Sequence, residues 1–486
     1  FKWPTLLLGK SPECPIAKWY KDHFYAYALK EAADGRGGIA LSVPGGGGFD
    51  AEEYTAEELV GQILAHAKML AEKTAEEAVK EAVITVRAVS GRSFATANRQ
   101  HSLTPSLARV QVPPFWGQDE RQAVMDAAEL AGLKVLSLMN ENTAVAMKYA
   151  IDRKFENTKE HNVIFYDMGS TSTKTSFVTF SAYDVLDGKK NKTVESFEVK
   201  AVAWDEFLGG HDFDSRIAKK MAEQFDEAHA KKMDGVSVFD SPRAMARMLK
   251  EAERYKVVLS ANKETPMNVE ALTNDIDFRS HITREEFETM CEDLFVRSTK
   301  PVEQLLEETG KEPGEVHAVV IIGGGSRIPE IQERIKKVMD REELNRNLNG
   351  DEAAALGAGF YAAGLSPSFR VRKVSVEDIF PYGVSATVSR GATSTSDKPP
   401  PTAEIFGKNS KMPLKKVLTF NRKDDFYMDI KVSNPERLPE CVSPMIGAYN
   451  ISGVAKAVAY NETEKPKISI TFELDRSGLL VVTKAE

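Results

Sequence analysis

One stretch of the chain, Val163–Phe177, constrains the fold and the chemistry more than any other. Its sequence, VIFYDMGSTSTKTSF, places an apolar run before Asp167, a turn of small and hydroxyl residues after it, and a strand-like run beyond. This pattern predicts a strand, a tight turn and a second strand. Turn amides and hydroxyls can hold phosphate oxygens, and a carboxylate can orient water around Mg²⁺. The stretch therefore predicts a phosphate loop, with an ordinary hairpin turn as the alternative.

Two further glycine turns favour the phosphate loop. The sequence LGGHD at Leu208–Asp212 opens the helical pattern Phe213–Phe225. The sequence VVIIGGGSRIP at Val319–Pro329 runs from a buried-type strand through three glycines to a helix that begins near Pro329. Glycines between a strand and a helix let a ligand approach the backbone at the helix N-terminus. Three such turns predict a nucleotide site, although the dinucleotide G-x-G-x-x-G and the P-loop spacings are both absent.

Six motifs, taken in order, resemble the ATPase domain of the 70-kDa heat-shock chaperones. They are NENTAVAMKYA at Asn140–Ala150, the DMGS turn, LGGHDFD at Leu208–Asp214, EAERYKVVLSAN at Glu251–Asn262, GGGSRIP, and NGDEAAALGA at Asn349–Ala358. The details resemble the large endoplasmic-reticulum branch of that family, the 170-kDa glucose-regulated or hypoxia up-regulated proteins. FYDMGS, MARMLKEAERYKVVLSAN and ITREEFETMCEDLFVRS carry this second resemblance.

The pattern along the chain changes near Leu365. Before it, strands and helices alternate, which indicates an α/β domain, and the resemblance implies an actin-like ATPase domain of two lobes with nucleotide between them. The elements expected there are helices Thr55–Lys73, Gln118–Ala131, Phe213–Phe225, Pro242–Ser260 and Thr283–Glu308 and strands Ala82–Val86, Asn162–Asp167, Lys174–Phe180 and Val316–Ile322. Thr55 and Glu58 are placed to form a capping box.

The C-terminal part is all-β in character. KISITFEL at Lys467–Leu474 alternates apolar and polar residues, as a half-buried strand does. The resemblance implies a β-sandwich that binds peptide, without the helical lid of the family. The expected organisation is therefore a nucleotide-binding domain over residues 1–365, a charged linker over 366–382 and an all-β substrate-binding domain over 383–486.

Two features depart from a smooth match to the family. The sequence begins at FKWPTLLLGK, which resembles a point well inside the first lobe; the first phosphate loop and the catalytic lysine are then missing, with Thr5 standing about where the lysine would fall. The Arg-rich segment Arg87–Val112 interrupts a strand and its continuation. It is interpreted as an insertion, either translated intron sequence or a genuine surface insertion, and is expected to leave the sheet edge as an ill-ordered loop.

The resemblance assigns site roles residue by residue. Asp167 would orient the attacking water, Glu141 would join the water shell of Mg²⁺, and Ser172 would act with them at the phosphates, so the metal would have no direct protein ligand. Contacts to ATP or ADP are expected from Gly169, Ser170, Thr171, Ser172, Gly209, Gly210, Glu253, Lys256, Ser260, Gly323, Gly324, Gly325, Arg327 and Asp351. Without the resemblance, Glu253, Lys256 and Ser260 would be interpreted as a solvated helix face.

Three positions differ from the pattern of the family. The second acid of the phosphate loop falls on Lys174, the adenine-stacking arginine on Val257, and the serine of the third turn on Gly325. Phosphoryl transfer depends on positioning and on neutralising charge. Together with the missing lysine, these changes predict ATP binding with slow or absent hydrolysis.

Composition narrows the partners. The 486 residues carry a net charge of −8 with both signs scattered, which argues against a nucleic-acid surface, and no apolar run is long enough to span a bilayer. The three cysteines are widely spaced and are expected to be thiols. Sequons at Asn191, Asn450 and Asn461 are compatible with the endoplasmic-reticulum lumen, the location that the resemblance implies.

Three functions remain open at this point. The first is an ATP-binding co-chaperone that holds unfolded polypeptides and promotes nucleotide exchange on a conventional lumenal 70-kDa heat-shock chaperone of the BiP type. The second is an ATP-hydrolysing folding chaperone that acts alone. The third, from another class, is an actin-like small-molecule kinase. Lys174 and Val257 favour the first over the second, and the β-rich C-terminal part argues against the third.

Overall fold

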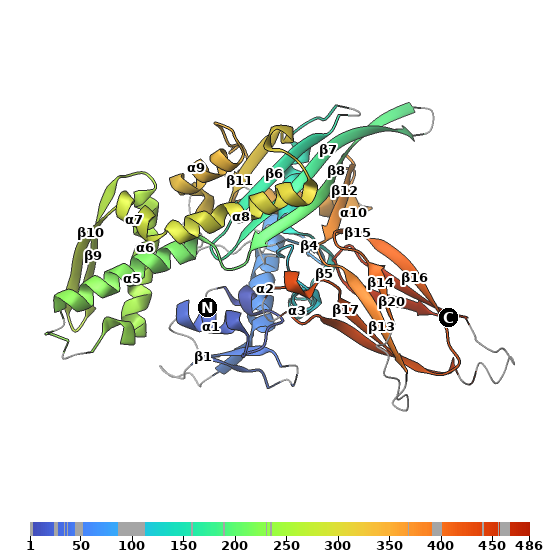
Figure 1. The fold of residues 1–486 in the computed structure, drawn as a ribbon, viewed down its shortest axis with the longest axis horizontal. Coiled ribbons are helices and arrows are strands. Elements are labelled where there is room, and N and C mark those ends of the chain that lie inside the picture. Colours follow the sequence, from blue (N-terminus) through green and yellow to red (C-terminus); the bar gives the residue numbers. More distant parts are fainter. Residues whose placement is uncertain are drawn as a thin grey trace.

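The computed structural model describes residues 3–23, 28–33, 35, 37–43, 52–85, 112–156, 159–187, 190–229, 231–233, 236–367, 369–390, 401–439, 442–454, 456 and 467–486. The molecule is elongated, with a helical unit and a two-stranded sheet at one end and the C-terminal strands at the other (Figure 1). The suspected insertion at residues 87–112 lies outside the described residues except for Val112, which is buried.

A six-stranded sheet forms the centre of the molecule, in the order β11-β6-β7-β8-β12-β15. Its strands are β6 (His161–Met168), β7 (Thr173–Asp187), β8 (Lys190–Asp205), β11 (Ala318–Ile322), β12 (Val374–Phe380) and β15 (Ser410–Met412). Strands β11 and β12 run parallel to their neighbours β6 and β8, whereas β6, β7 and β8 are antiparallel. The predicted strand–turn–strand around Asp167 is confirmed, and its second strand continues beyond the expected Phe180.

Helices cover both faces of this sheet. Alternate residues of β6 belong to two separate cores, with Ile164 and Tyr166 in one and Val163 and Phe165 in the other. Such two-sided burial explains why the strand is almost continuously apolar. The helices that contribute to these cores are α4 (Glu141–Ile151) and α10 (Ala353–Leu365) on one side and α5 (Gly210–His229), α6 (Pro242–Leu259), α7 (Arg284–Met290), α8 (Glu292–Thr309) and α9 (Pro329–Val338) on the other.

The N-terminal part forms a third core beside the sheet. Its elements are α1 (Pro15–His23), α2 (Ala56–Ala75), α3 (Gln118–Leu130), and strands β1 (Ala28–Glu31), β2 (Ile39–Val43), β3 (Glu52–Thr55), β4 (Glu81–Ile84) and β5 (Lys134–Leu138). The predicted capping box is confirmed, because Thr55 accepts from the Glu58 amide and Glu58 accepts from the Thr55 amide. Helix α3 begins at the predicted residue, Gln118.

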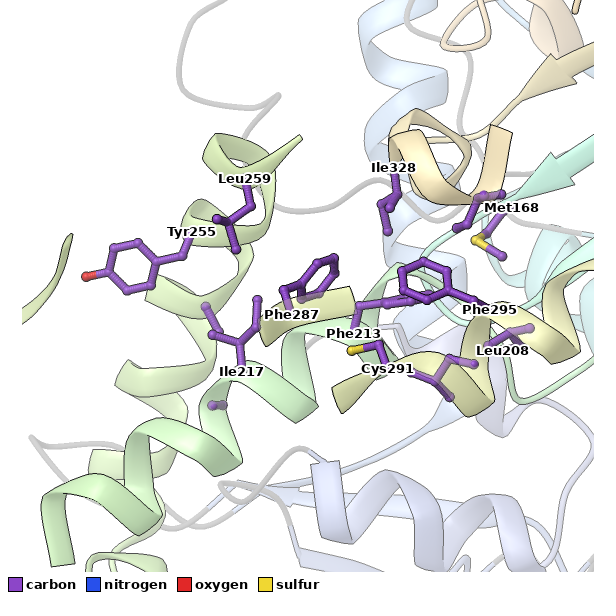
Figure 2. Packing of buried hydrophobic residues seen from close by; sticks show 14 of the residues in the cluster. Met168, Leu208, Phe213, Ile217, Tyr255, Leu259, Phe287, Cys291, Phe295 and Ile328 are labelled. Atoms are coloured by element: carbon purple, nitrogen blue, oxygen red, sulfur yellow. The ribbon is translucent and has the colours of Figure 1, made fainter. Parts of the chain in front are cut away.

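Two expected helices have different bounds. Helix α5 begins at Gly210, inside the glycine turn and earlier than the expected Phe213. The single helix expected over Thr283–Glu308 is wrong: α7 ends at Met290, and α8 starts after Cys291, whose backbone leaves the helical range. Cys291 lies among Phe213, Phe287 and Phe295 in the core (Figure 2). Strands β9 (Glu264–Thr273) and β10 (Ile276–Thr283) pair beside α6.

The C-terminal part consists of two antiparallel sheets that share one core. The strands are β13 (Val384–Arg390), β14 (Thr402–Phe406), β17 (Phe426–Val432) and β18 (Met445–Ile451) in one sheet, and β16 (Leu414–Asn421), β19 (Lys467–Leu474) and β20 (Leu480–Ala485) in the other. The predicted alternation of β19 is confirmed: Ile468, Ile470, Phe472 and Leu474 are buried, whereas the residues between them are partly exposed.

Seven of the 17 residues of the predicted linker are part of the central sheet. Val374–Phe380 forms strand β12, which pairs with β8 over Val374–Glu377 and with β15 over Asp378–Phe380. Over these seven residues the segment predicted as a linker is instead a strand, because its backbone groups are hydrogen-bonded to two neighbouring strands. Short 3-10 turns complete the described structure: Pro4–Leu7, Val238–Asp240, Pro313–Glu315, Gly325–Arg327 and Pro435–Arg437.

The expectation of three thiols is also wrong. Cys14 is disulfide-bonded, whereas Cys291 is a buried free thiol. Cys441 lies outside the described residues. Among the described helices, none combines the length and the apolar character that a membrane crossing requires.

Candidate functional site

The first glycine turn, at Gly169, and the third, at Gly323–Gly325, lie side by side because the strands that precede them are neighbours. The second glycine turn is the one at Gly209 and Gly210. Strand β11 pairs in parallel with β6, and Ile322 stands opposite Asp167, so both strands end at the same edge. A Cβ atom at Gly323 would lie 2.1 Å from the carbonyl oxygen of Met168 and 2.4 Å from Oδ1 of Asp167. The φ angle of Gly323 is +85°. Only glycine fits this close approach of two turns.

The second turn is hydrogen-bonded to the first. The amide of Gly210 donates to the carbonyl of Gly169 at 2.9 Å, and the amide of His211 donates to the carbonyl of Ser170 at 2.8 Å. A Cβ atom at Gly209 would lie 2.3 Å from the carbonyl carbon of Ser170. The sequence separates the three predicted turns widely, but the structure brings them together.

Some turn amides are already engaged within the protein. The Gly169 amide donates to the carbonyl of Ser172 at 3.0 Å and closes the hairpin turn. With the amides of Gly210 and His211, it fixes the turns rather than pointing at a phosphate. The neighbouring hydroxyl residues Ser170, Thr171 and Ser172 are the remaining parts of the loop expected to meet a ligand, and Thr171 and Ser172 are buried.

Helix α6 is joined to the second turn by Lys256. Its Nζ donates to the carbonyl of Gly210 at 2.6 Å and lies 2.7 Å from Oδ1 of Asp214. Ser260, at the end of the same helix, donates to the carbonyl of Lys256 at 3.1 Å. Glu253 is partly buried, one turn before Lys256. This helix face is thus attached to the site rather than merely solvated.

The third turn offers an open position. Gly324 is exposed, and a Cβ atom there would meet nothing within 4 Å. At Gly325, by contrast, a Cβ atom would lie 2.5 Å from Cγ of Met168, so the serine of the family pattern would require the Met168 side chain to move. Arg327 and Asp351 are both exposed and lie 3.5 Å apart, so the two residues expected to border the nucleoside do meet.

Ser172 also lines a small pocket with the N-terminal segment. Thr5, at the position expected for the catalytic lysine, lines the same pocket. Lys10 lines it as well, but its ammonium forms a buried ion pair with Glu120. The pocket therefore contains a lysine, but one held by a carboxylate of α3.

The two predicted catalytic acids are bridged by a lysine. Nζ of Lys174 lies 2.5 Å from Oε2 of Glu141 and 3.4 Å from Oδ2 of Asp167. The hairpin register brings Lys174 next to Asp167, because the two residues stand directly opposite each other on the paired strands. All three residues are buried, with Lys174 fully enclosed.

These residues do not fit the magnesium-water shell that the resemblance implies. Mg²⁺ needs a near-octahedral set of oxygens and retains several waters. A lysine ammonium has no acceptor, and here it takes the position between the two carboxylates. Among the described residues, no group of three or more His, Cys, Asp or Glu could hold a metal ion. The third turn, by contrast, keeps open space at Gly324, with Arg327 in the same turn.

Sequence reasoning missed two acids of the second turn. Asp214 pairs with Lys256, and Asp212 accepts from the Gly209 amide at 2.8 Å. Burial raises the pKa of Asp212 to about 7. Both acids belong to the LGGHDFD motif. Their position beside a glycine turn at the N-terminus of a helix could have identified them from the sequence.

A family model, Hsp70 protein, matches residues 94–486, which is most of the chain. The chain belongs to the Hsp70 family. Hypoxia up-regulated protein 1 of Danio rerio is 36% identical over 499 residues, covering 100% of this chain and 47% of the relative. The Xenopus laevis protein of the same name is 36% identical over 100% of this chain and 71% of its own length. Heat shock 70 kDa protein 17 of Arabidopsis thaliana is 34% identical over 93% of this chain and 49% of the relative.

These matches confirm the resemblance to the hypoxia up-regulated branch of the Hsp70 family. The chain spans about half the length of the zebrafish relative. The mixed α/β architecture with several sheets agrees with an Hsp70-family protein. These matches do not support the hypothesis of an actin-like small-molecule kinase.

Proposed function

We propose that this chain is a nucleotide-binding co-chaperone. In this proposal residues 1–365 form an actin-like ATPase domain that binds ATP or ADP, and residues 383–486 form a β-sandwich that binds unfolded polypeptides. The chain then promotes nucleotide exchange on a conventional lumenal 70-kDa heat-shock chaperone. The endoplasmic-reticulum lumen is the proposed location. Membership of the Hsp70 family and the similarity to hypoxia up-regulated protein 1 support the chaperone role.

One observation carries the nucleotide site: three glycine turns from distant parts of the sequence meet at one sheet edge. Gly169 and Gly210 are joined by a hydrogen bond, and Gly323 packs against Asp167. Lys256 and Arg327 add cationic groups beside these turns. Glycine turns at helix N-termini beside basic side chains suit an anionic, phosphate-bearing ligand.

The buried lysine argues against an ATP-hydrolysing chaperone that acts alone. Lys174 is paired with both Glu141 and Asp167, the two acids proposed to position water. A carboxylate already paired with an ammonium is a poor group for orienting a nucleophile, and phosphoryl transfer depends on such positioning. Exposed Val257 stands where a stacking arginine was expected. Binding is thus proposed to persist where turnover is slow or absent.

Gly324 allows a direct test of the site. In Gly324→Leu the new side chain meets no protein atom at Cβ, so the fold should survive while the side chain enters the space proposed for adenosine. Calorimetry with ADP should show binding to the wild-type chain and none to the variant. Gly314→Leu is the matched control, because its Cβ also meets nothing within 4 Å and it lies before β11, away from the turns. Unchanged affinity in Gly324→Leu would refute the site.

The exchange role has its own experiment. A conventional lumenal heat-shock chaperone is loaded with fluorescent ADP, and release is followed after adding this chain and excess unlabelled ATP. Wild-type chain should accelerate release. If release stays at its spontaneous rate while aggregation of an unfolded client is still suppressed, the role is restricted to holding polypeptides. If neither effect appears, the co-chaperone proposal fails.

A further inference from the structure

We propose that Lys174 replaces the divalent cation at this site, so that the chain binds a nucleoside di- or triphosphate without metal. This inference rests on the proposed nucleotide site and adds to it the form of the ligand. The cation in this structure is the ammonium group of Lys174, a side chain of strand β7. The protein would therefore bind ADP or ATP without holding a metal ion between its own carboxylates and the phosphates.

The position of Lys174 supports this reading. It lies two residues after Ser172, at the base of the phosphate turn, and opposite Asp167 in the hairpin. Its Nζ lies 2.5 Å from Glu141 at the start of α4 and 3.4 Å from Asp167 at the end of β6. The ammonium thus joins two elements at the edge where the glycine turns meet.

Burial makes the cation a fixed part of the site. The side chain of Lys174 is 0% exposed and those of Glu141 and Asp167 are 2% exposed. Removing one partner from a buried ion pair leaves an uncompensated charge, which is strongly unfavourable. Lys174 therefore cannot move away to leave space for a metal ion without leaving the carboxylates of Glu141 and Asp167 close together and unpaired.

A count of formal charge explains how a lysine can stand in for Mg²⁺. An acid at position 174 would give three carboxylates around one point, a set that calls for a divalent cation. Lysine at that position changes the charge of the side chain from minus one to plus one. That change equals the charge a divalent ion would bring, so the site with lysine and no metal has the same total charge as a three-acid site with metal bound.

The two arrangements exclude each other. Mg²⁺ at oxygen distances of about 2.0–2.1 Å with its waters needs the volume that the ammonium occupies. At the separations seen here, a second cation would also be strongly repelled by Lys174. In this chain the protein itself supplies the positive charge. A metal ion could accompany the nucleotide only by binding phosphate oxygens that face solvent.

The test is calorimetry of ADP with the full chain, in excess EDTA and in excess Mg²⁺. The wild-type chain should bind with affinities that agree within about twofold, less than 0.5 kcal/mol. Lys174→Asp restores the three-acid set, so its affinity in EDTA should fall at least about tenfold and Mg²⁺ should restore it. Lys200→Asp is the control, because Lys200 lies on β8 of the same sheet but is solvent-accessible; it should behave as wild type.

Each outcome separates this inference from the proposed function. Binding by the wild-type chain only when Mg²⁺ is present would overturn the inference and leave the nucleotide site standing. Absence of binding in both solutions would overturn the nucleotide site itself. If Lys174→Asp fails to fold, as judged by circular dichroism, the wild-type comparison and Lys174→Met decide: the methionine variant, which lacks the cation, should lose affinity in EDTA.

Discussion

The guanidinium of Arg121 donates a hydrogen bond of 2.9 Å to the carbonyl oxygen of Ser477. Arg121 lies on α3 in the N-terminal core, whereas Ser477 lies in the turn between β19 and β20. The same guanidinium donates to Oδ1 of Asn140, and Nδ2 of Asn140 donates to Asp378 on β12. A single fully buried arginine therefore connects the helical part, strand β12 and the C-terminal sheets.

Arg121→Met should loosen the contact between α3 and the β19–β20 turn. The variant keeps most of the side-chain volume but leaves the Ser477 carbonyl and Asn140 without their charged donor, at a cost of about 1.5–3 kcal/mol. The readout is hydrogen exchange at the amide of Leu480, which donates to Oε1 of Gln118 at 2.8 Å. We expect exchange there to accelerate by about tenfold or more.

Arg279→Met provides the comparison for this experiment. Arg279 is an exposed residue of β10, a strand that Figure 1 shows at the end of the molecule opposite the C-terminal sheets. Its loss should leave exchange at Leu480 unchanged. If Arg121→Met also leaves it unchanged, Arg121 does not hold these parts together.

Asp212 should make stability depend on pH in an unusual direction. Burial raises its pKa from 3.8 to about 7, so the folded chain binds a proton that the unfolded chain has already released in this window. The contribution to folding is fully present below 3.8 and is lost as pH rises through about 7. Chemical denaturation across that window should show Asp212→Asn losing less stability than wild type as pH rises.

Asparagine keeps an acceptor for the Gly209 amide but cannot ionise, so the difference between the two proteins isolates the titration. Asp277→Asn serves as a contrast, because hydrogen bonds lower the pKa of Asp277 on the exposed β10. Identical pH profiles for wild type and Asp212→Asn would show that Asp212 is ionised throughout.

The glycine turns could be predicted from sequence because a turn depends on local chemistry. The meeting of the turns follows from the parallel pairing of β11 with β6, which was not visible in either segment alone. Lys174 was recognised by position, but its contacts with Glu141 and Asp167 depend on the hairpin register and on where α4 begins. The sequence thus indicated which residues matter, and tertiary pairing decided what they touch.

Strand β12 and the helix break at Cys291 could not be predicted for related reasons. The segment around β12 is charged and contains two prolines, which suggested a linker; its strand conformation is stabilised by hydrogen bonds to β8 and β15. Neither glycine nor proline marks the break between α7 and α8, where the helical pattern of the sequence simply continues.

Cys291 should be unreactive in the folded chain. Burial among aromatic rings raises the pKa of its thiol to about 12, so the reactive thiolate is scarce at neutral pH (Figure 2). Iodoacetamide should leave this cysteine unmodified in the native chain and modify it fully in denaturant, as measured by peptide mass spectrometry. Rapid native modification would mean that the α7–α8 break opens to solvent.

Phe472→Ala should unfold the C-terminal sheets before the rest of the chain. Phe472 is 0% exposed in the core that both sheets share, so its loss should cost about 3–5 kcal/mol. Val417→Ala on neighbouring β16 is the control, because Val417 is 55% exposed and its loss should cost less than about 0.5 kcal/mol.

Two spectroscopic signals can separate the parts, because all four tryptophans precede residue 365. In urea, tryptophan fluorescence should therefore follow mainly the N-terminal part, while circular dichroism follows both. In Phe472→Ala the circular dichroism transition should begin at lower urea while the main fluorescence transition stays close to its wild-type midpoint. Trp204 packs against the C-terminal core, which should add a small early fluorescence change. A single shared transition that shifts as one would instead mean that β12 and Arg121 couple the parts into one cooperative unit, and that residues 366–382 do not mark a domain boundary.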